Sequence, residues 1–172
     1  MTIKKPFVFI LLFLFCVTGC QEVKKQGIVE TANEKPNSTE EKKAILKTLN
    51  DETKAAFERD YDAWQKKWVH DPNITKTYID FEKGTFSEAL GWNEISQFVK
   101  TFMDEHPEPE PLPELLNKIE VRLYGNGAWV TYGQQDSLRG RKRETRLMEK
   151  IDGEWKIAGM QTTIYGFDSD KN

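Results

Sequence analysis

The stretch Glu144–Thr163, ETRLMEKIDGEWKIAGMQTT, consists of two alternating runs that meet at Asp152-Gly153. This dipeptide is among the strongest short-range signals for a β-hairpin, because both residues tolerate the positive φ angles of a type I′ turn. Uninterrupted alternation puts large apolar side chains on both faces of the hairpin: Leu147, Ile151, Ala158, Met160 and Ile164 on one, and Met148, Trp155 and Ile157 on the other. We therefore expect both faces to be covered, one of them by helices.

A second hairpin is predicted directly before the first. Residues 117–124 alternate apolar and polar side chains, Asn126-Gly127 is another favoured turn dipeptide, and residues 128–134 alternate again. The basic run DSLRGRKR, residues 136–143, then forms the loop between the two hairpins. Together the hairpins predict at least four antiparallel strands.

The first half of the chain predicts two helices. Ser38-Thr39-Glu40-Glu41 is a capping box, and apolar residues then recur at steps of three and four. A break is expected near Arg59, with Asp60 as a second N-cap. Residues 74–86 predict a pair of short strands, and residues 91–105 predict a second amphipathic helix. Helices followed by consecutive strands indicate an α+β fold, with the helices on one side of a curved sheet.

The segment 106–114, HPEPEPLPE, contains four prolines. Proline lacks a backbone N–H group, so this segment is neither a helix interior nor a central strand. We interpret it as an exposed, stiff connector. The alternative is a docking segment in the polyproline conformation.

Composition excludes several classes of function. The 172 residues carry 25 basic and 28 acidic side chains, so the formal net charge is −3. A nucleic-acid-binding domain usually has a basic excess on one surface, and we therefore expect no nucleic-acid partner. The two cysteines, Cys16 and Cys20, both lie in the first twenty residues. The rest of the chain therefore has no disulfide, no thiolate metal site and no cysteine nucleophile.

The first twenty residues, MTIKKPFVFILLFLFCVTGC, are typical of a bacterial lipoprotein signal peptide. A basic start precedes an apolar run that is too short for a comfortable membrane span, and Val17-Thr18-Gly19-Cys20 resembles a lipobox. We expect Cys20 to be diacylated, to become the new N-terminus and to anchor the protein to a membrane. The alternatives are an ordinary signal peptide and an uncleaved anchor. Gln21, in place of Asp, favours the periplasmic face of the outer membrane in a cell with two membranes.

Four segments are therefore expected along the chain. They are a lipoprotein signal peptide over residues 1–20, a flexible polar tether over 21–37, a folded domain over 38–166 and a polar tail over 167–172. The tether lifts the folded domain away from the bilayer.

Three motifs in the folded domain carry a resemblance to a known family. They are GW-x-x-I at Gly91–Ile95, NG-x-W-V-T at Asn126–Thr131 and E-x-R-x-x-E-K-x-DG-x-W-K-I at Glu144–Ile157. This order resembles the SnoaL-like branch of the nuclear transport factor 2-like superfamily. The resemblance implies a cone-shaped, cystatin-like fold, in which a bent antiparallel sheet wraps a long N-terminal helix, with a second helix beside it. It also implies a pocket at the open end and frequent dimerisation through the outer sheet face. Fold alone leaves function open in this superfamily.

The enzymes of this family place an Asp, His or Tyr in the pocket for proton transfer. His70, at the end of the first helical region, and Asp60, at the edge of its apolar stripe, are the candidates in this chain. We favour a structural role for both, because His70-Asp71-Pro72 is typical of a turn and Asp60 of a helix cap. The isomerase arrangement, an Asp base with a Tyr and a protonated Asp, does not map onto this sequence.

Arg146 and a set of aromatic residues are the candidates for ligand binding. Arg146 either clamps the carboxylate of a ligand or pairs with Glu144 or a neighbouring acid. The other candidates line a pocket for a flat apolar ligand or simply form the core, which we favour: Trp64, Trp68, Tyr78, Trp92, Tyr132 and Met160. We expect no metal and no cofactor, because only His70 and His106 are histidines and no glycine-rich phosphate loop occurs.

Three hypotheses of function follow. The first is a lipid-anchored domain of the cell envelope that binds a small apolar or amphipathic molecule without turnover. The second is an enzyme of the isomerase, cyclase or dehydratase type that uses Asp60 or His70. The third is an interaction module that forms a homodimer through the sheet face bearing Trp129, Trp155 and Ile157.

Overall fold

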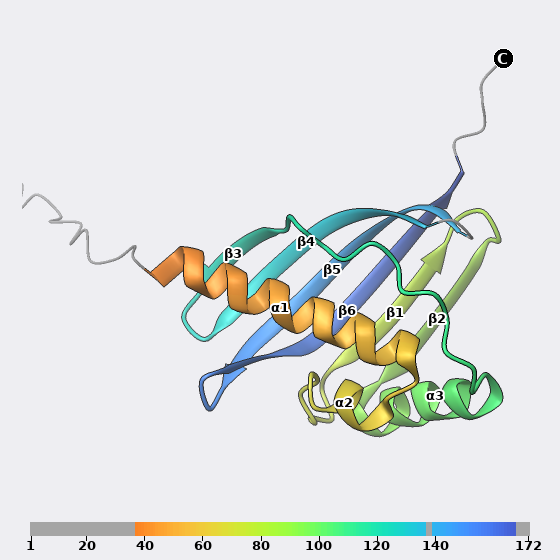
Figure 1. Ribbon diagram of the computed structural model, residues 1–172, viewed down its shortest axis with the longest axis horizontal. Coiled ribbons are helices and arrows are strands. Elements are labelled where there is room, and N and C mark those ends of the chain that lie inside the picture. The colour runs from red at the N-terminus through yellow and green to blue at the C-terminus, as the bar shows by residue number, and fades with distance from the viewer. Residues whose placement is uncertain (1–36, 137–138, 168–172) are drawn as a thin grey trace, which may run out of the picture. The chain divides into compact units, whose positions relative to one another are not determined.

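The computed structural model describes residues 37–136 and 139–167 (Figure 1). Within these residues the order is helix, helix, two strands, helix and four strands, as an α+β fold requires. The helices are α1 Asn37–Glu58, α2 Tyr61–Gln65 and α3 Gly91–Glu105. The strands are β1 Thr75–Asp80, β2 Thr85–Leu90, β3 Glu120–Tyr124, β4 Gly127–Asp136, β5 Gly140–Ile151 and β6 Glu154–Gly166. The predicted signal peptide, Cys20 and most of the tether lie outside the described residues.

The strands form one curved sheet in the order β2-β1-β6-β5-β4-β3 (Figure 1). All neighbours are antiparallel except β1 and β6, which run parallel. A parallel pair needs a long crossover connection, and here the crossover contains α3 and strands β2 to β5. The predicted α+β architecture is therefore confirmed, with one parallel pair inside the sheet.

Both predicted hairpins form. Asp152 and Gly153 have φ angles of 52° and 84°, as a type I′ turn requires. The other hairpin turns one residue earlier than predicted. Tyr124 pairs with Gly127, so Gly125 and Asn126 make the loop.

The predicted division of the last hairpin into two faces is wrong beyond a β-bulge. Leu147 pairs with Gly159, but Met148 pairs with Ile157, so Ala158 is an extra residue in β6. An extra residue reverses the alternation of the strand that carries it. Ile157 and Met160 therefore share one face, which the helices cover, and both are buried. We call the helix-covered face of the sheet the inner face and the opposite one the outer face.

This bulge also corrects the face proposed for dimerisation. Trp155 and Ile157 are buried under the helices, where Trp155 Nε1 donates a hydrogen bond to Glu41 of α1. Trp129 alone of the three lies on the outer face, with 49% of its surface exposed. The predicted combination of residues therefore does not form one surface.

The break between the first two helices occurs where the sequence predicts it. Arg59 has a φ of 64°, which ends α1, and the Asp60 carboxylate accepts a hydrogen bond from Ala63 N at 2.8 Å as the N-cap of α2. α1 then crosses the inner face, and α3 packs on β1 and β2 (Figure 1). The core between helices and sheet includes Ile45, Leu49, Trp64, Trp68, Ile95, Val130, Met148 and Ile157.

Arg59 also ties the proline-rich segment to the helices. Its Nε donates to His106 O at 2.7 Å, and its Nη2 lies 2.6 Å from Glu110 Oε1. Glu110 N donates to Phe57 O at 3.0 Å. The segment has no helix or strand up to β3, and these contacts with the domain's own helices favour the connector interpretation.

Candidate functional site

The pairing register places polar residues side by side on the inner face. Two adjacent rows run across the sheet from β4 to β2. The first, which we call the arginine row, consists of Val130, Arg146, Met160, Lys76 and Ala89. The second, the tyrosine row, consists of Tyr132, Glu144, Thr162, Tyr78 and Ser87. Because side chains of one row point to the same side, two buried cations and one buried carboxylate meet under the helices.

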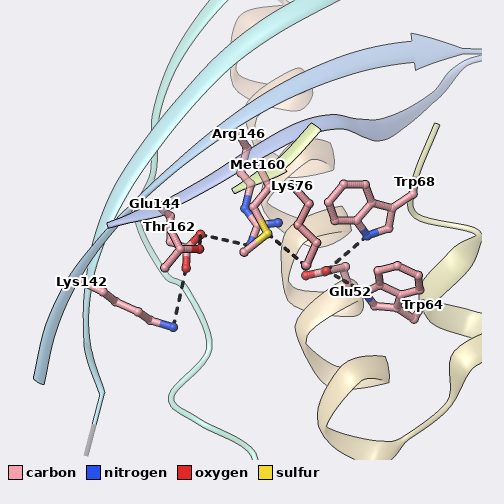
Figure 2. Close-up of polar contacts among 9 residues, drawn as sticks. All are labelled: Glu52, Trp64, Trp68, Lys76, Lys142, Glu144, Arg146, Met160 and Thr162. Atoms are coloured by element: carbon pink, nitrogen blue, oxygen red, sulfur yellow. Dashed lines mark hydrogen bonds and ion pairs between the residues drawn. The ribbon is translucent and has the colours of Figure 1, made fainter. Parts of the chain in front are cut away.

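Glu144 is the anionic centre of these rows. Its Oε2 accepts a hydrogen bond from Thr162 Oγ1 at 2.9 Å and lies 3.3 Å from Arg146 Nη2 (Figure 2). Its Oε1 lies 3.7 Å from Lys142 Nζ. The carboxylate is almost fully buried, so its charge depends on these partners.

Arg146 is only partly partnered. Its side chain is 5% exposed, and its Nε and Nη1 make no hydrogen bond to any residue that the structure describes. Burial by itself disfavours the charged guanidinium, but Tyr132, Glu144 and Glu52 together raise the pKa of Arg146 above its ordinary value. The buried guanidinium is therefore charged at all physiological pH values, with two nitrogens unpaired.

Tyr132 is held neutral beside it. Burial raises the pKa of Tyr132 well above its ordinary value, and the attraction of Arg146 for the phenolate only partly opposes this effect. The phenol therefore stays protonated around neutral pH and does not act as a base there.

Lys76 lies in an aromatic environment. Its Nζ donates to Met160 Sδ at 3.2 Å and lies 5.0 Å from the ring centre of Trp68 and 5.4 Å from that of Tyr78. Glu52 Oε1 accepts hydrogen bonds from the indoles of Trp64, at 2.9 Å, and Trp68, at 3.3 Å (Figure 2). The indole rings thus separate the buried ammonium from a buried carboxylate and interact favourably with both.

A small cavity borders Lys76. It has a volume of about 60 Å³ and lies between β1, β2 and α3, lined by Lys76, Tyr78, Ser87, Glu88, Ala89 and Phe98. A second, more open hollow of about 490 Å³ lies beside β3 and β4, lined by Arg122, Leu123, Tyr124 and Trp129. The small cavity is lined by residues of both polar rows. The larger hollow opens beside Trp129 on the outer face.

The predicted pocket residues do not line one pocket, because most of them lie in the core. Trp64, Trp68, Tyr132 and Met160 are buried in the core, whereas Tyr78 and Trp92 are half-buried. Of the predicted set, Tyr78 lines the small cavity. Arg146 and Met160 are neighbours in the arginine row, and Met160 is in turn the neighbour of Lys76.

Neither predicted proton carrier lines a hollow. His70 is exposed; its ring stacks on Trp92 with the ring centres 3.8 Å apart, and its Nε2 lies 3.0 Å from Gln65 O. Asp60 is exposed, and its carboxylate accepts a hydrogen bond from Ala63 N as the N-cap of α2. Both side chains therefore have structural contacts that account for their positions.

Sequence reasoning missed Lys76 and Glu52, although each carried a signal. Lys76 has the same alternation as Ile74 and Tyr78, so a regular strand places all three on the same face. Glu52 lies three residues after Leu49 and four before Ala56, on the apolar stripe of α1. A charged residue at a core position is the observation that would have identified both.

Two further searches of residues 37–136 and 139–167 gave negative results. No group of three or more His, Cys, Asp and Glu side chains in these ranges is arranged to hold a metal ion. No helix in the same ranges is long and apolar enough to cross a membrane.

Comparison with protein families identifies the domain. The profile of the SnoaL-like domain matches residues 45–164, which include both polar rows. This chain belongs to the SnoaL-like domain family. The resemblance that the three sequence motifs suggested is thereby confirmed. No protein of curated function matches the SnoaL-like chain in sequence.

Solved structures share the fold of this SnoaL-like domain. A nuclear transport factor 2-like protein of unknown function from Shewanella oneidensis is 23% identical, with 72% of this chain and 98% of that chain covered and a TM-score of 0.51. A cystatin-like fold protein from Burkholderia xenovorans is 18% identical, with 76% and 96% covered and a TM-score of 0.58. A nuclear transport factor 2-like protein of unknown function from Pseudomonas putida is 16% identical, with 73% and 87% covered and a TM-score of 0.56. These likenesses confirm the cystatin-like fold.

Proposed function

We propose that this SnoaL-like domain binds a small amphipathic molecule on the inner face of its sheet, without turnover. The observation that carries the proposal is the cavity beside Lys76. Its wall is apolar at Ala89 and Phe98 and polar at Lys76, Tyr78, Ser87 and Glu88. Ligand sites combine an apolar lining with a few polar groups that fix orientation, and this cavity has both.

Binding without turnover is supported by the positions of the two proton carriers that the sequence predicted. His70 and Asp60 lie outside the cavity, and the Tyr132 phenol remains protonated. General acid–base catalysis needs a group whose pKa is close to the working pH and within reach of the substrate. The inner face instead presents charges held by neighbours, which suits binding.

Native mass spectrometry of the full-length chain, purified in mild detergent from the cell envelope, tests this proposal. We expect a co-purifying small mass at a stoichiometry of one per chain. Ala89→Leu fills the cavity and should remove the bound mass. Ala63→Leu, a matched change at a half-buried position on α2, should retain it. An Ala89→Leu variant that keeps the ligand would place binding elsewhere and overturn the proposal.

We further propose that Cys20 anchors the domain to a membrane of the cell envelope, with the periplasmic face of an outer membrane as the expected site. The support is the short apolar run that ends in Val17-Thr18-Gly19-Cys20. Cys20→Ser should move the protein from the membrane fraction to the soluble fraction, whereas Cys16→Ser should leave it in the membrane fraction. Equal membrane association of both variants would contradict lipidation.

An interaction module that forms a homodimer is the second candidate function. It is favoured by the open hollow beside Tyr124 and Trp129, which are each 49% exposed. Large half-exposed aromatic side chains are typical of interface centres. Light scattering should show a dimer that Trp129→Lys dissociates. Phe81→Lys, an exposed aromatic outside the hollow, should leave the dimer intact. A monomeric wild-type protein would exclude this candidate.

A further inference from the structure

Arg146 supplies both of the buried side-chain nitrogens that lack a hydrogen-bond partner among the described residues. Burying a charged N–H group without a partner costs free energy, so such groups are rare in folded proteins and call for an explanation. The neighbouring carboxylates do not supply the missing bonds. Glu144 reaches only Nη2, and Glu52 Oε1 is bonded to two indoles.

The planar guanidinium keeps Nε and Nη1 available as donors, while Glu144 and the Tyr132 hydroxyl are its side-chain partners. Nη2 carries two hydrogens, one directed to the side of Nε and the other to the side of Nη1. Whichever of the two faces Glu144, the other forms a parallel pair with Nε or with Nη1. Since both of those nitrogens are unpartnered, Arg146 can bind one planar, two-oxygen acceptor in addition to Glu144.

We propose that the ligand of this SnoaL-like domain is a short monocarboxylic acid whose carboxylate binds the free fork of Arg146; this inference rests on the proposed binding function. A carboxylate matches the spacing of two parallel N–H groups. A single negative charge suits the site better than a phosphate dianion, because Glu144 lies 3.3 Å from the same guanidinium and repels further negative charge.

The arginine row also defines where the rest of the ligand lies. Met160 stands between Arg146 and Lys76, and the cavity lies on the far side of Met160, against Lys76. The proposal requires that Met160, an unbranched and flexible side chain, rotate so that the cavity extends to Arg146. Two strand spacings separate Arg146 from Lys76, which limits the acid to about 10 Å in length.

The test uses pairs of molecules that differ only in charge. The full-length chain in detergent is titrated calorimetrically with hexanoate and hexanamide, and with benzoate and benzamide. We expect at least one acid to bind about 10- to 100-fold more tightly than its amide, as a charged two-point hydrogen bond implies. Arg146→Met should remove this preference. Arg59→Lys, a change at another buried arginine, should preserve it.

Each result decides the matter. Equal binding of acid and amide overturns the carboxylate inference and leaves the proposed binding function intact. Binding of neither pair at millimolar concentration overturns the carboxylate inference, whereas the proposed binding function is decided separately by the native mass spectrometry described above. If Arg146→Met does not fold, the comparison of acid with amide on the wild-type chain still decides, and Arg146→Lys, which keeps the charge but loses the fork, should bind the acid more weakly.

Discussion

Two arginines of this SnoaL-like domain are almost entirely buried, and they are partnered in opposite ways. Arg59, 9% exposed, donates from Nε to His106 O at 2.7 Å, from Nη1 to Ala56 O at 2.8 Å and from Nη2 to Glu110 Oε1 at 2.6 Å. Arg146, 5% exposed, has one ionic contact, 3.3 Å from Nη2 to Glu144. Every nitrogen of the Arg59 guanidinium therefore has a hydrogen-bond acceptor, whereas two nitrogens of the Arg146 guanidinium have none among the described residues.

The difference follows from the elements that carry the two residues. Arg59 lies at a helix break beside an irregular segment, where backbone carbonyls are free to accept hydrogen bonds. Arg146 lies in the middle of β5 between two paired strands, and the carbonyls around it are already used in the sheet. An arginine at the centre of a sheet must therefore find side-chain or ligand acceptors, and this one finds the Glu144 carboxylate and the Tyr132 hydroxyl, with Nε and Nη1 left unpartnered by the residues that the structure describes.

Removing the carboxylate of Glu144, the ionic partner of Arg146, should lower the free energy of unfolding more than any other change proposed here. Glu144→Gln keeps the shape and the Thr162 contact but leaves Arg146 without an anion, which should lower the free energy of unfolding by about 3–5 kcal/mol. Urea denaturation measures the change. Glu149→Gln, on the exposed side of the same strand, should change stability by less than about 0.5 kcal/mol. A similarly small loss for Glu144→Gln would mean that the ion pair contributes nothing.

Removing the three hydrogen bonds of Arg59 should cause the second-largest loss of stability. Arg59→Met removes three hydrogen bonds, one of them to a carboxylate, and should cost about 2–4 kcal/mol. Proteolysis of residues 106–119 should also become faster, because the tie to Glu110 is lost. Arg122→Met, at an exposed arginine, is the control. Unchanged proteolysis would show that Arg59 does not hold this segment.

Replacing both members of the incomplete pair should be far milder than replacing one. Glu144→Gln combined with Arg146→Met leaves no uncompensated buried charge, and we expect its unfolding free energy to lie within about 1 kcal/mol of the wild type. The double variant should still lose the preference for acids over amides. Additive losses from the two single changes would contradict the view that the pair is an energetically isolated unit.

The helix cap next to Arg59 should contribute less. Asp60→Ala removes the hydrogen bond from Ala63 N and should lower stability by about 1 kcal/mol, with no effect on ligand binding. Asp104→Ala, at an exposed position in α3, should be nearly neutral. A loss of binding in Asp60→Ala would restore this residue as a functional acid.

The smallest effect is expected at the partly exposed ion pairs of Asp51 with Lys47 and Lys67. Burial alone would raise the pKa of Asp51, but hydrogen bonds from Lys47 and Lys67 lower it below its ordinary value. A lowered folded-state pKa stabilises above the unfolded pKa, and the contribution disappears as pH falls through the folded pKa. Asp51→Asn should therefore cost about 0.2–1 kcal/mol at pH 7 and nothing in strong acid. A pH-independent difference would contradict this assignment.

Local signals in the sequence determined the elements of the fold. The break at Arg59 and the turn at Asp152-Gly153 are found in the structure, and the first helix forms but begins at Asn37, with the Glu41 carboxylate accepting hydrogen bonds from Lys150 and Trp155. Such signals are reliable because they depend on the backbone preferences of a few neighbouring residues. The order of elements, together with three short motifs, was also enough to indicate the SnoaL-like family.

The site was decided by packing across the sheet. The bulge at Ala158 reversed the faces of β6 and so brought Met160 under the helices, next to Arg146. The parallel pairing of β1 with β6 then put Lys76 beside Met160. Both depend on contacts between residues far apart in the chain, and a single shift of register moves every side chain of a strand to the other face. The sequence by itself determined most of the helices and strands, although residues 140–143 of the predicted loop belong to β5; only the tertiary structure decided which charges are buried together.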